Sequence, residues 1–352
     1  MSLQPSIHSC FQDAVLYPKL FKLQDNLYAA SFFLMKLLPA KFILDNARKE
    51  GKIRPGSTIA ETTSGTFGLA LAMLCNHYGY KCILVSDPVL DPLLKNRIES
   101  LGAVVDIVAE PSKVGGYQRA RLDRLNEHLD KHKDSFWPMQ YENHNNPSSY
   151  ALLAEYFATA LGKIDCLIGT VGSGGSMCGT SLFLRKVNPD MQAIGVDTIN
   201  SILFGQPDGK RLVRGLGNSI MPAILDHTIF DEVHWLSAEE TFAATRNIHK
   251  QHGLFVGATG GAAYKVAKHW ADRHPKLTTV FICADEGYRY LDNVFDDNWV
   301  DAQNLNLNRA FPEPLITSSP LKEMKQWTMM DWGRRTLQEV IQANRSNVEV
   351  MA

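Results

Sequence analysis

The sequence predicts an α/β fold made of two doubly wound domains whose sheets are mainly parallel. Short apolar segments alternate with longer amphipathic ones, which is the pattern of parallel strands connected by helices on both faces of a sheet. The 352 residues are more than one hydrophobic core usually serves. Two glycine-rich loops, 62–68 and 172–176, each follow an expected strand, and parallel sheets bind ligands at that edge.

The individual elements follow from the spacing of apolar residues, with short apolar runs for strands and a three-to-four-residue period for helices. The sequence predicts strands at 57–61, 82–86, 103–108, 166–171, 192–197 and 278–283. It predicts helices at 68–77, 91–101, 117–132, 148–161, 175–187, 238–252, 261–273 and 332–344.

The chain is expected to divide into two domains and an extension. We expect residues 1–40 together with 151–305 to form a larger domain, 41–150 a smaller, mobile domain, and 306–352 a C-terminal extension. The loop-rich segment 143–149 is the expected junction. The glycine-rich connection 205–222 is expected to be functional, since connections that long inside a compact domain usually are.

Composition favours a small-molecule function in a reducing compartment. A net charge of −1 gives no electrostatic argument for nucleic acid or an anionic membrane as partner. The six cysteines are scattered without a Cys-x-x-Cys pair, so we expect them to be reduced. The N-terminus shows no secretory signal, and the apolar run 29–44 is interrupted by Lys36, Pro39 and Lys41. We therefore expect a cytoplasmic protein.

Lys36 lies in an apolar segment, Ser31-Phe-Phe-Leu-Met-Lys-Leu-Leu-Pro-Ala40. A lysine among apolar side chains loses the hydration that its ammonium form needs, so its pKa falls and its amine becomes a nucleophile toward aldehydes. The alternative is an amphipathic lysine whose charged end reaches solvent from a core helix. Lys41 is a rival for this chemistry, but it lies nearer the polar face of the segment with Asp45 and Arg48.

The loop Gly172-Ser-Gly-Gly-Ser176 stands between an apolar strand and a helix and is suited to a phosphate. A dinucleotide fingerprint remains an alternative, although Met177 occupies the place of its third glycine and only Asp197 offers the acid after the next strand. A plain strand–helix turn is the third reading.

The loop Thr62-Thr-Ser-Gly-Thr-Phe-Gly68 suits a second anion, most naturally a carboxylate, or is a helix start capped by Thr63 or Ser64. A lysine able to form an imine, together with a phosphate loop, points to pyridoxal 5′-phosphate as the cofactor. No metal is expected, because His128 and His132 lie at helical spacing among charged residues and indicate a solvated face.

These motifs occur in the order found in the fold-type II pyridoxal-phosphate enzymes, and the chain resembles their cysteine synthase and cystathionine β-synthase family from Leu27 to Leu291. The resemblance is carried by Lys36 ahead of Pro39-Ala40, the loop 63–68, Gln140-Tyr141, the loop 172–176, Gly215-Leu-Gly217, and Gly253-Leu-Phe-Val-Gly257. It implies a fold similar to the tryptophan synthase β-subunit, and a homodimer. It also implies that the larger domain, 1–40 with 151–305, is the cofactor domain and the smaller one, 41–150, the substrate domain.

The resemblance also implies roles for individual residues. Lys36 would be the catalytic lysine that binds the cofactor. Substrate would be bound by Thr63, Ser64, Gly65, Gln140 and Gly215. The cofactor phosphate would be bound by Gly172, Ser173, Gly174, Gly175 and Ser176.

Several departures indicate a divergent branch of the family. Thr66 replaces the asparagine that touches the cofactor's phenolic oxygen, and Ala284-Asp-Glu-Gly-Tyr-Arg-Tyr290 replaces a segment with serine near the pyridine nitrogen. Asp285 or Glu286 would keep that nitrogen protonated and strengthen the electron sink. The segments 201–205 and 214–222 are similar to branches that make diaminopropionate precursors.

The expected reaction is a β-replacement on an O-activated serine-type amino acid through an aminoacrylate, with a nucleophilic co-substrate. One alternative is β-elimination with deamination, which needs no nucleophile. A catalytically inactive scaffold of the same fold is an alternative of another class, and a nicotinamide enzyme is a more distant one. The sequence leaves the leaving group and the nucleophile open.

Overall fold

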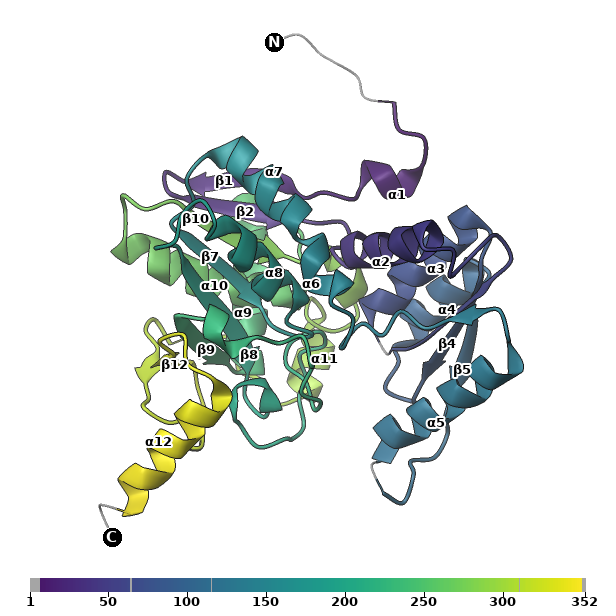
Figure 1. Cartoon of the computed structure of the whole chain (residues 1–352). Coiled ribbons are helices and arrows are strands. Elements are labelled where there is room, and N and C mark those ends of the chain that lie inside the picture. The colour runs from purple at the N-terminus through teal and green to yellow at the C-terminus, as the bar shows by residue number, and fades with distance from the viewer. Residues whose placement is uncertain (1–6, 64, 115, 310, 350–352) are drawn as a thin grey trace. The chain divides into compact units, whose positions relative to one another are not determined.

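A computed structural model describes residues 7–63, 65–114, 116–309 and 311–349 of the chain (Figure 1). The chain forms two compact units. Unit 1 comprises Met1–Pro18 and Phe33–Gln140, and unit 2 comprises Lys19–Phe32 and Tyr141–Ala352. The chain therefore passes between the units near residues 18, 32 and 140.

Unit 1 is built on a four-stranded sheet in which all paired strands are parallel. Its strands, in order across the sheet, are β5 (Val104–Ile107), β4 (Lys81–Ser86), β3 (Thr58–Thr62) and β6 (Ser135–Phe136). Its helices are α1 (Phe11–Ala14), α2 (Leu37–Lys49), α3 (Thr66–Tyr78), α4 (Pro92–Ser100) and α5 (Gly116–Lys131).

Alternate residues of β3 and β4 face opposite sides of this sheet, and each side has its own core. Ile59 and Leu84 pack with apolar residues of α2, α3 and α4. Ala60 and Val85 pack on the other side with Leu125 of α5. Helices on both faces make unit 1 a doubly wound layer structure, as the sequence predicts.

Unit 2 is built on an eight-stranded sheet of order β1-β2-β10-β7-β8-β9-β12-β11. Its strands are β1 (Lys19–Gln24), β2 (Leu27–Ser31), β7 (Cys166–Thr170), β8 (Gln192–Thr198), β9 (Glu232–Leu236), β10 (Thr279–Cys283), β11 (Leu315–Ile316) and β12 (Thr328–Asp331). Pairing is parallel from β2 through β9 and antiparallel where β1 joins β2 and β12 joins β9.

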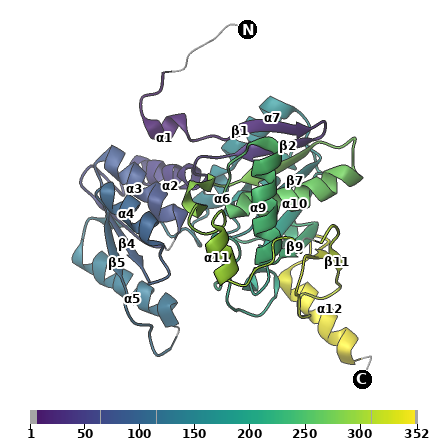
Figure 2. The same cartoon turned by 180° about the vertical axis from the view of Figure 1, so that it is seen from behind.

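Helices cover both faces of this sheet. Figure 1 shows α7 (Ala151–Leu161) and α8 (Gly175–Leu184) on one face, and Figure 2 shows α9 (Ala238–His252) and α10 (Ala258–Arg273) on the other. The remaining helices of unit 2 are α6 (Asn145–Ser149), α11 (Asp297–Ala302), α12 (Leu337–Glu349) and the 3₁₀ turns Ile202–Phe204, His227–Ile229 and Gly287–Tyr290. The expected α/β fold with two doubly wound, mainly parallel sheets is confirmed. Within the described residues, no helix is both long and apolar enough to cross a membrane.

The boundaries of the units differ from the expected division. Residues 33–40, which include Lys36, belong to unit 1, while 19–32 supply two strands to the larger sheet. The expected junction 143–149 is largely helix α6, and the units meet in sequence at Gln140 and Tyr141 instead. The proposed C-terminal extension contributes β11 and β12 to the large sheet, so it is not an appendage.

The last helix begins at Leu337 and not at Trp332 as the sequence predicts. Gly333 and Arg334 both have positive φ, +61° and +56°, which interrupts a right-handed helix. The backbone N–H groups of Trp332 and Gly333 both donate to the carbonyl oxygen of Asp231. These bonds fix the turn between β12 and α12 to the body of unit 2.

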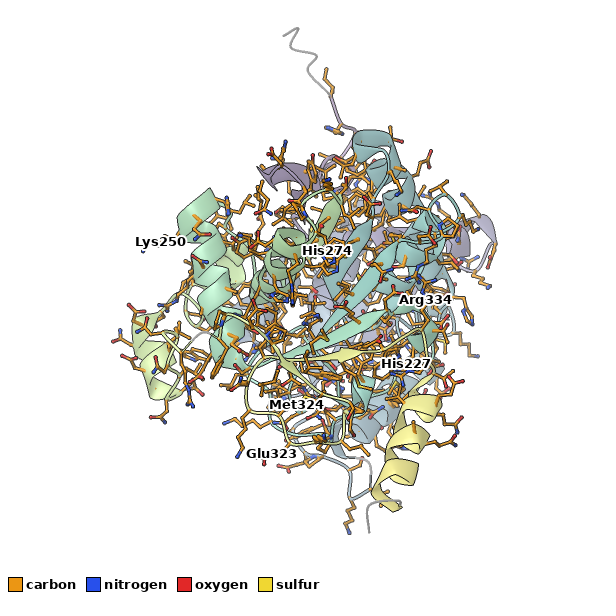
Figure 3. All side chains as sticks on the ribbon, turned by 90° about the vertical axis from the view of Figure 1, so that its left-hand side faces the viewer. His227, Lys250, His274, Glu323, Met324 and Arg334 are labelled. Carbon is orange, nitrogen blue, oxygen red and sulfur yellow. The ribbon has the colours of Figure 1, made fainter. Side chains whose placement is uncertain are left out.

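Trp332 is the main apolar anchor of this turn. Its side chain is fully buried, and its ring packs edge-on against Phe204 at 5.2 Å and stacks on His227 at 5.9 Å. Arg334 pairs with Asp231, with 2.7 Å between Nε and Oδ1. Figure 3 shows His227 and Arg334 on the side of unit 2 from which α12 extends. The end of the chain is therefore an integral part of the fold.

Replacing Trp332 with alanine is expected to lower the free energy of unfolding of unit 2 by about 3–5 kcal/mol, because a large buried side chain leaves a cavity. Denaturant unfolding followed by circular dichroism measures the change. Leu315→Ala is the control, since Leu315 is 55% exposed on β11 and should change the stability little. Equal stability of the two variants would contradict the anchoring role of Trp332.

Candidate active site

Lys36 immediately precedes helix α2 and is partly buried. The residues on either side of it, Met35 and Leu37, are buried, and its carbonyl oxygen accepts the N–H of Ala40 at 3.2 Å. Burial lowers the pKa of the Lys36 ammonium to about 8. A substantial fraction of the amine is then neutral at mildly alkaline pH, which imine chemistry requires.

Lys41 is held in the opposite protonation state. Its Nζ lies 2.8 Å from Oδ2 of Asp45, and Arg48 contacts the other oxygen of that carboxylate. Burial is the largest single effect and acts against the charge, but the hydrogen bonds and negative charge of Asp45 and Tyr78 together outweigh it and raise the pKa of Lys41 above its ordinary value. A lysine that stays charged is a poor nucleophile, which favours Lys36 over its rival.

The loop after β3 leads directly into helix α3. The Thr63 N–H donates to the Val85 carbonyl oxygen at 3.1 Å, and the Thr63 hydroxyl accepts the Gly65 N–H at 3.2 Å. The N-cap is Gly65, which makes no side-chain cap, so the expectation of a helix capped by Thr63 or Ser64 is wrong. Ser64 itself lies outside the described residues. The N–H groups of the first helical turn, which begins at Thr66, point in the direction from which an anion binds.

Glu61 lies beneath this loop, at the end of β3, and was not singled out from the sequence. It is buried, and its Oε1 accepts the Thr62 N–H and the Trp137 Nε1–H, both at 2.8 Å. Its Oε2 accepts the N–H of Gln140 at 3.2 Å. Burial raises the pKa of Glu61 to about 7, against the effect of these donors. Gln140 is thereby connected to the strand that carries Thr63.

The loop Gly172–Ser176 of unit 2 forms the start of helix α8. Gly174 is the N-cap with φ of +84°, a conformation that favours glycine. A Cβ on Gly175 would lie 2.2 Å from Oδ1 of Asn146, so α6 packs directly on this backbone. Ser173 and Ser176 are both buried. Small residues, hydroxyl groups and the N-terminus of a ten-residue helix fit a phosphate.

The glycine pair Gly215 and Gly217 lies against the same loop. Both have positive φ, and the Gly217 N–H donates to Val171 at 3.2 Å. Nδ2 of Asn218 donates to the carbonyl oxygen of Gly172 at 3.3 Å. A Cβ on Gly215 would lie 3.5 Å from the methyl group of Thr259, at the start of α10. Unit 2 thus brings the expected phosphate loop and the Gly215 wall together.

Asp285 follows β10 and is buried. Its Oδ2 accepts from Arg289 at 3.0 Å and from the Tyr290 hydroxyl at 3.1 Å, whereas its Oδ1 is buried without a partner in the described structure. Burial raises its pKa, and Arg289 opposes the rise. Glu286 is partly buried and forms a backbone bridge with Val256.

The polar atoms of unit 2 fit a bound cofactor. Oδ1 of Asp285 and Oγ1 of Thr259 are both buried without a partner among the described residues, and such atoms usually have one. The Gly257 N–H donates to the Asp285 carbonyl oxygen at 3.0 Å, which ties the α10 start to this segment. A polar ligand beside the phosphate loop would satisfy these atoms.

Two alternative sites receive no support. Nε2 of His128 pairs with Oδ2 of Asp106 at 2.7 Å, and the described residues contain no cluster of three or more ligands for a metal ion. Asp197 is fully buried, and its Oδ1 accepts the N–H of the adjacent Thr198 at 2.8 Å, so it serves its own loop.

Comparison with known proteins defines the class. Residues 18–285 match the family described as pyridoxal-phosphate dependent enzyme. The N-(2-amino-2-carboxyethyl)-L-glutamate synthase of Cupriavidus metallidurans is 33% identical over 280 residues, which cover 78% of this chain and 82% of that protein.

Solved structures agree. An O-acetylserine dependent cystathionine β-synthase from Helicobacter pylori has a TM-score of 0.75 and 29% identity, over 82% of this chain and 99% of that one. A hydrogen sulfide-producing enzyme from Fusobacterium nucleatum has a TM-score of 0.76 and 26% identity, with the same coverage.

The chain belongs to the family of pyridoxal-phosphate dependent enzymes. Pyridoxal phosphate is its cofactor, and the expected enzyme class, a β-replacing amino-acid synthase of the cysteine synthase type, is confirmed. The scaffold and nicotinamide alternatives are thereby set aside. The individual site residues remain predictions.

Competitive acetylation of the apoenzyme, followed by peptide mass spectrometry, is expected to separate the two lysines. A lowered pKa leaves the amine neutral above about pH 8, so labelling of Lys36 should rise through that pH. Lys41 should label poorly until much higher pH, since its pKa is raised. In denatured protein both should titrate near the free value, about 10.4. Parallel titration of the two lysines in the folded protein would contradict these environments.

Gly175→Ala is expected to weaken cofactor binding, because the added Cβ must displace Asn146 and the loop that packs on it. Overpacking of this kind costs about 1–3 kcal/mol, or roughly five- to 100-fold in the dissociation constant. Equilibrium dialysis of pyridoxal phosphate measures it. Leu182→Ala, at a residue of α8 that is 52% exposed, is the control. Unchanged affinity in both variants would argue against the phosphate assignment.

Proposed function

We propose that the enzyme joins the three-carbon unit of an O-activated serine to the amine of a second amino acid such as glutamate. The relative from Cupriavidus metallidurans carries this proposal, because its name describes a glutamate bearing a 2-amino-2-carboxyethyl group on nitrogen. Formation of that bond is a β-replacement with an amine as nucleophile.

The proposed roles in unit 1 concern the substrate. Its carboxylate is bound by Thr63, Ser64, Gly65 and Gln140. The neutral amine of Lys36 takes the proton from the substrate α-carbon and later returns it to the product. The leaving group departs from the β-carbon with its bonding electrons, and the incoming amine nitrogen forms the new bond there and releases a proton. The lowered pKa of Lys36 supports this role.

The proposed roles in unit 2 concern the cofactor. Pyridoxal phosphate, when bound, supplies an aromatic ring that accepts the electrons of the α-carbon. The backbone of 172–176 and the hydroxyls of Ser173 and Ser176 hold its phosphate. Of Asp285 and Glu286, we assign Asp285 to the pyridine nitrogen, since one of its buried oxygens has no partner within the described structure. Unit 2 is then the cofactor domain, with Gly215 contacting substrate, and unit 1 the substrate domain.

The assembly and compartment belong to the same proposal. We propose a homodimer that works in the cytoplasm. The unpaired state of Cys10, Cys75, Cys82, Cys166, Cys178 and Cys283 supports a reducing compartment. Light scattering of the purified protein tests the dimer.

Incubation of the purified holoenzyme with O-acetyl- or O-phospho-L-serine and L-glutamate is expected to yield one product with the mass of N-(2-amino-2-carboxyethyl)-glutamate. Mass spectrometry with sulfide or no nucleophile as comparison identifies the preferred co-substrate. Pyruvate formation at the same rate without any nucleophile would favour β-elimination and contradict the synthase proposal.

Lys36→Ala should abolish turnover while leaving the fold intact, and borohydride reduction of wild type should place a pyridoxyl group on Lys36. Lys41→Ala is the matched control and should keep most of the activity. A pyridoxyl group on Lys41, or full activity of Lys36→Ala, would refute the assignment.

A further inference from the structure

Glu61 is an unusual residue for its position. It lies in the short strand Thr58-Ile-Ala-Glu-Thr62, it is only 2% exposed, and within the described part of the chain its carboxylate accepts from N–H groups and not from a cation. A buried carboxylate without a countercharge is costly unless several donors satisfy it. Its partners are instead N–H groups of Thr62, Trp137, Met139 and Gln140. The side chain therefore contributes hydrogen bonds to these segments, and not apolar packing.

The segment that follows β6 explains what these bonds do. β6 pairs with β3 only at Ser135 and Phe136, so the backbone ladder ends two residues before Glu61 in β3. Met139 then adopts φ of +56°, a conformation that a residue with a side chain rarely takes. Past the ladder, the carboxylate of Glu61 connects segment 137–140 to β3 through the Trp137 Nε1–H and the backbone N–H groups of Met139 and Gln140.

The two segments that the Glu61 carboxylate connects carry residues proposed to bind the substrate carboxylate. Oε1 receives the N–H of Thr62, which directly precedes Thr63, and Oε2 receives the N–H of Gln140 itself. Thr63 also packs closely on the backbone of Gly68 in α3, because a Cβ on Gly68 would lie 2.7 Å from the Thr63 methyl group. The carboxylate of Glu61 therefore links Gln140 to the strand that leads into Thr63 within unit 1.

We propose that Glu61 is a positioning residue that holds the Thr63 loop and Gln140 in register, so that together they select substrates bearing an α-carboxylate. It acts through these two segments and does not touch the substrate. The proposal rests on the proposed function, which assigns Thr63 and Gln140 to the carboxylate. It extends that function by identifying a third residue, Glu61, on which the selection for the α-carboxylate depends.

The test measures selection for the carboxylate separately from cofactor binding. L-Alanine and ethylamine both carry a primary amine that can react with the bound cofactor, but only alanine has a carboxylate. Their dissociation constants are measured from the change in absorbance of the holoenzyme, and the ratio of the two constants reports the carboxylate site.

Glu61→Gln keeps the size of the side chain but places an NH₂ group against at least one N–H donor. We expect it to weaken alanine binding by about tenfold or more, because a hydrogen bond to a charged group is lost. Ethylamine binding and cofactor content should stay unchanged, and turnover should show a raised KM for the O-activated serine with a smaller change in kcat.

Glu240→Gln is the matched control. Glu240 is 1% exposed and likewise accepts backbone N–H groups, from Trp327 at 2.8 Å and Ser237 at 3.1 Å, but it belongs to helix α9 of unit 2. Its replacement makes the same chemical change in an equally buried setting. It should leave the ratio of the two dissociation constants as in wild type.

Trp137→Phe provides a second variant if Glu61→Gln does not fold. It removes one donor to Oε1 and leaves the carboxylate and its bonds to Thr62 and Gln140 in place. We expect a smaller loss in the same direction, roughly threefold in alanine binding, since the bond to Gln140 persists. An unchanged ratio in this variant would count against the proposal.

The outcomes separate the two proposals. If wild type favours alanine over ethylamine and Glu61→Gln does so equally, or if both ligands weaken together, Glu61 is not a positioning residue for the carboxylate. If wild type itself does not favour alanine, Thr63 and Gln140 are not the carboxylate site, and the proposed function and this inference both fail.

Discussion

Parallel pairing places the carboxyl ends of neighbouring strands at one edge of a sheet, and the candidate residues of each unit lie at such an edge. In unit 2, β7 leads into the loop 172–176 and β10 leads into Asp285. In unit 1, β3 leads into Thr63 and the start of α3. The direction of the strands thus brings residues that are distant in sequence to the same side of their unit.

The site also depends on ionisable groups that are taken out of water, each compensated in a different way. Burial lowers the pKa of Lys36. Glu61 accepts hydrogen bonds from several N–H donors, and its pKa still rises because burial dominates. Asp285 has Arg289 on one oxygen, and its other oxygen has no partner among the described residues. The energetic cost of these groups fits the general observation that active sites keep strained or poorly solvated residues for their chemistry.

Much of the fold was predictable, because helices and buried parallel strands have distinct apolar periods. The predicted ends of β3, β7 and β10 agree with the observed ends to within two residues. Three of the strands that were not predicted carry that signal only weakly. β1 is an edge strand whose residues are all exposed or half-buried, β9 includes the buried His234, and β12 is only four residues long. Their pairing is decided by contacts between distant segments, which periodicity does not record.

The candidate site was predictable where a residue's chemistry is visible in its own neighbourhood, as for Lys36 in its apolar segment. Glu61 had a local signal as well, an acid in an apolar strand, but nothing near it in sequence indicates its partners. Those partners, Trp137 and Gln140, come from a segment that leaves β3 after two paired residues and turns at Met139. Motifs locate the groups that meet a substrate. The groups that hold those motifs in place, such as Glu61, are identified from hydrogen bonds between segments that are distant in sequence.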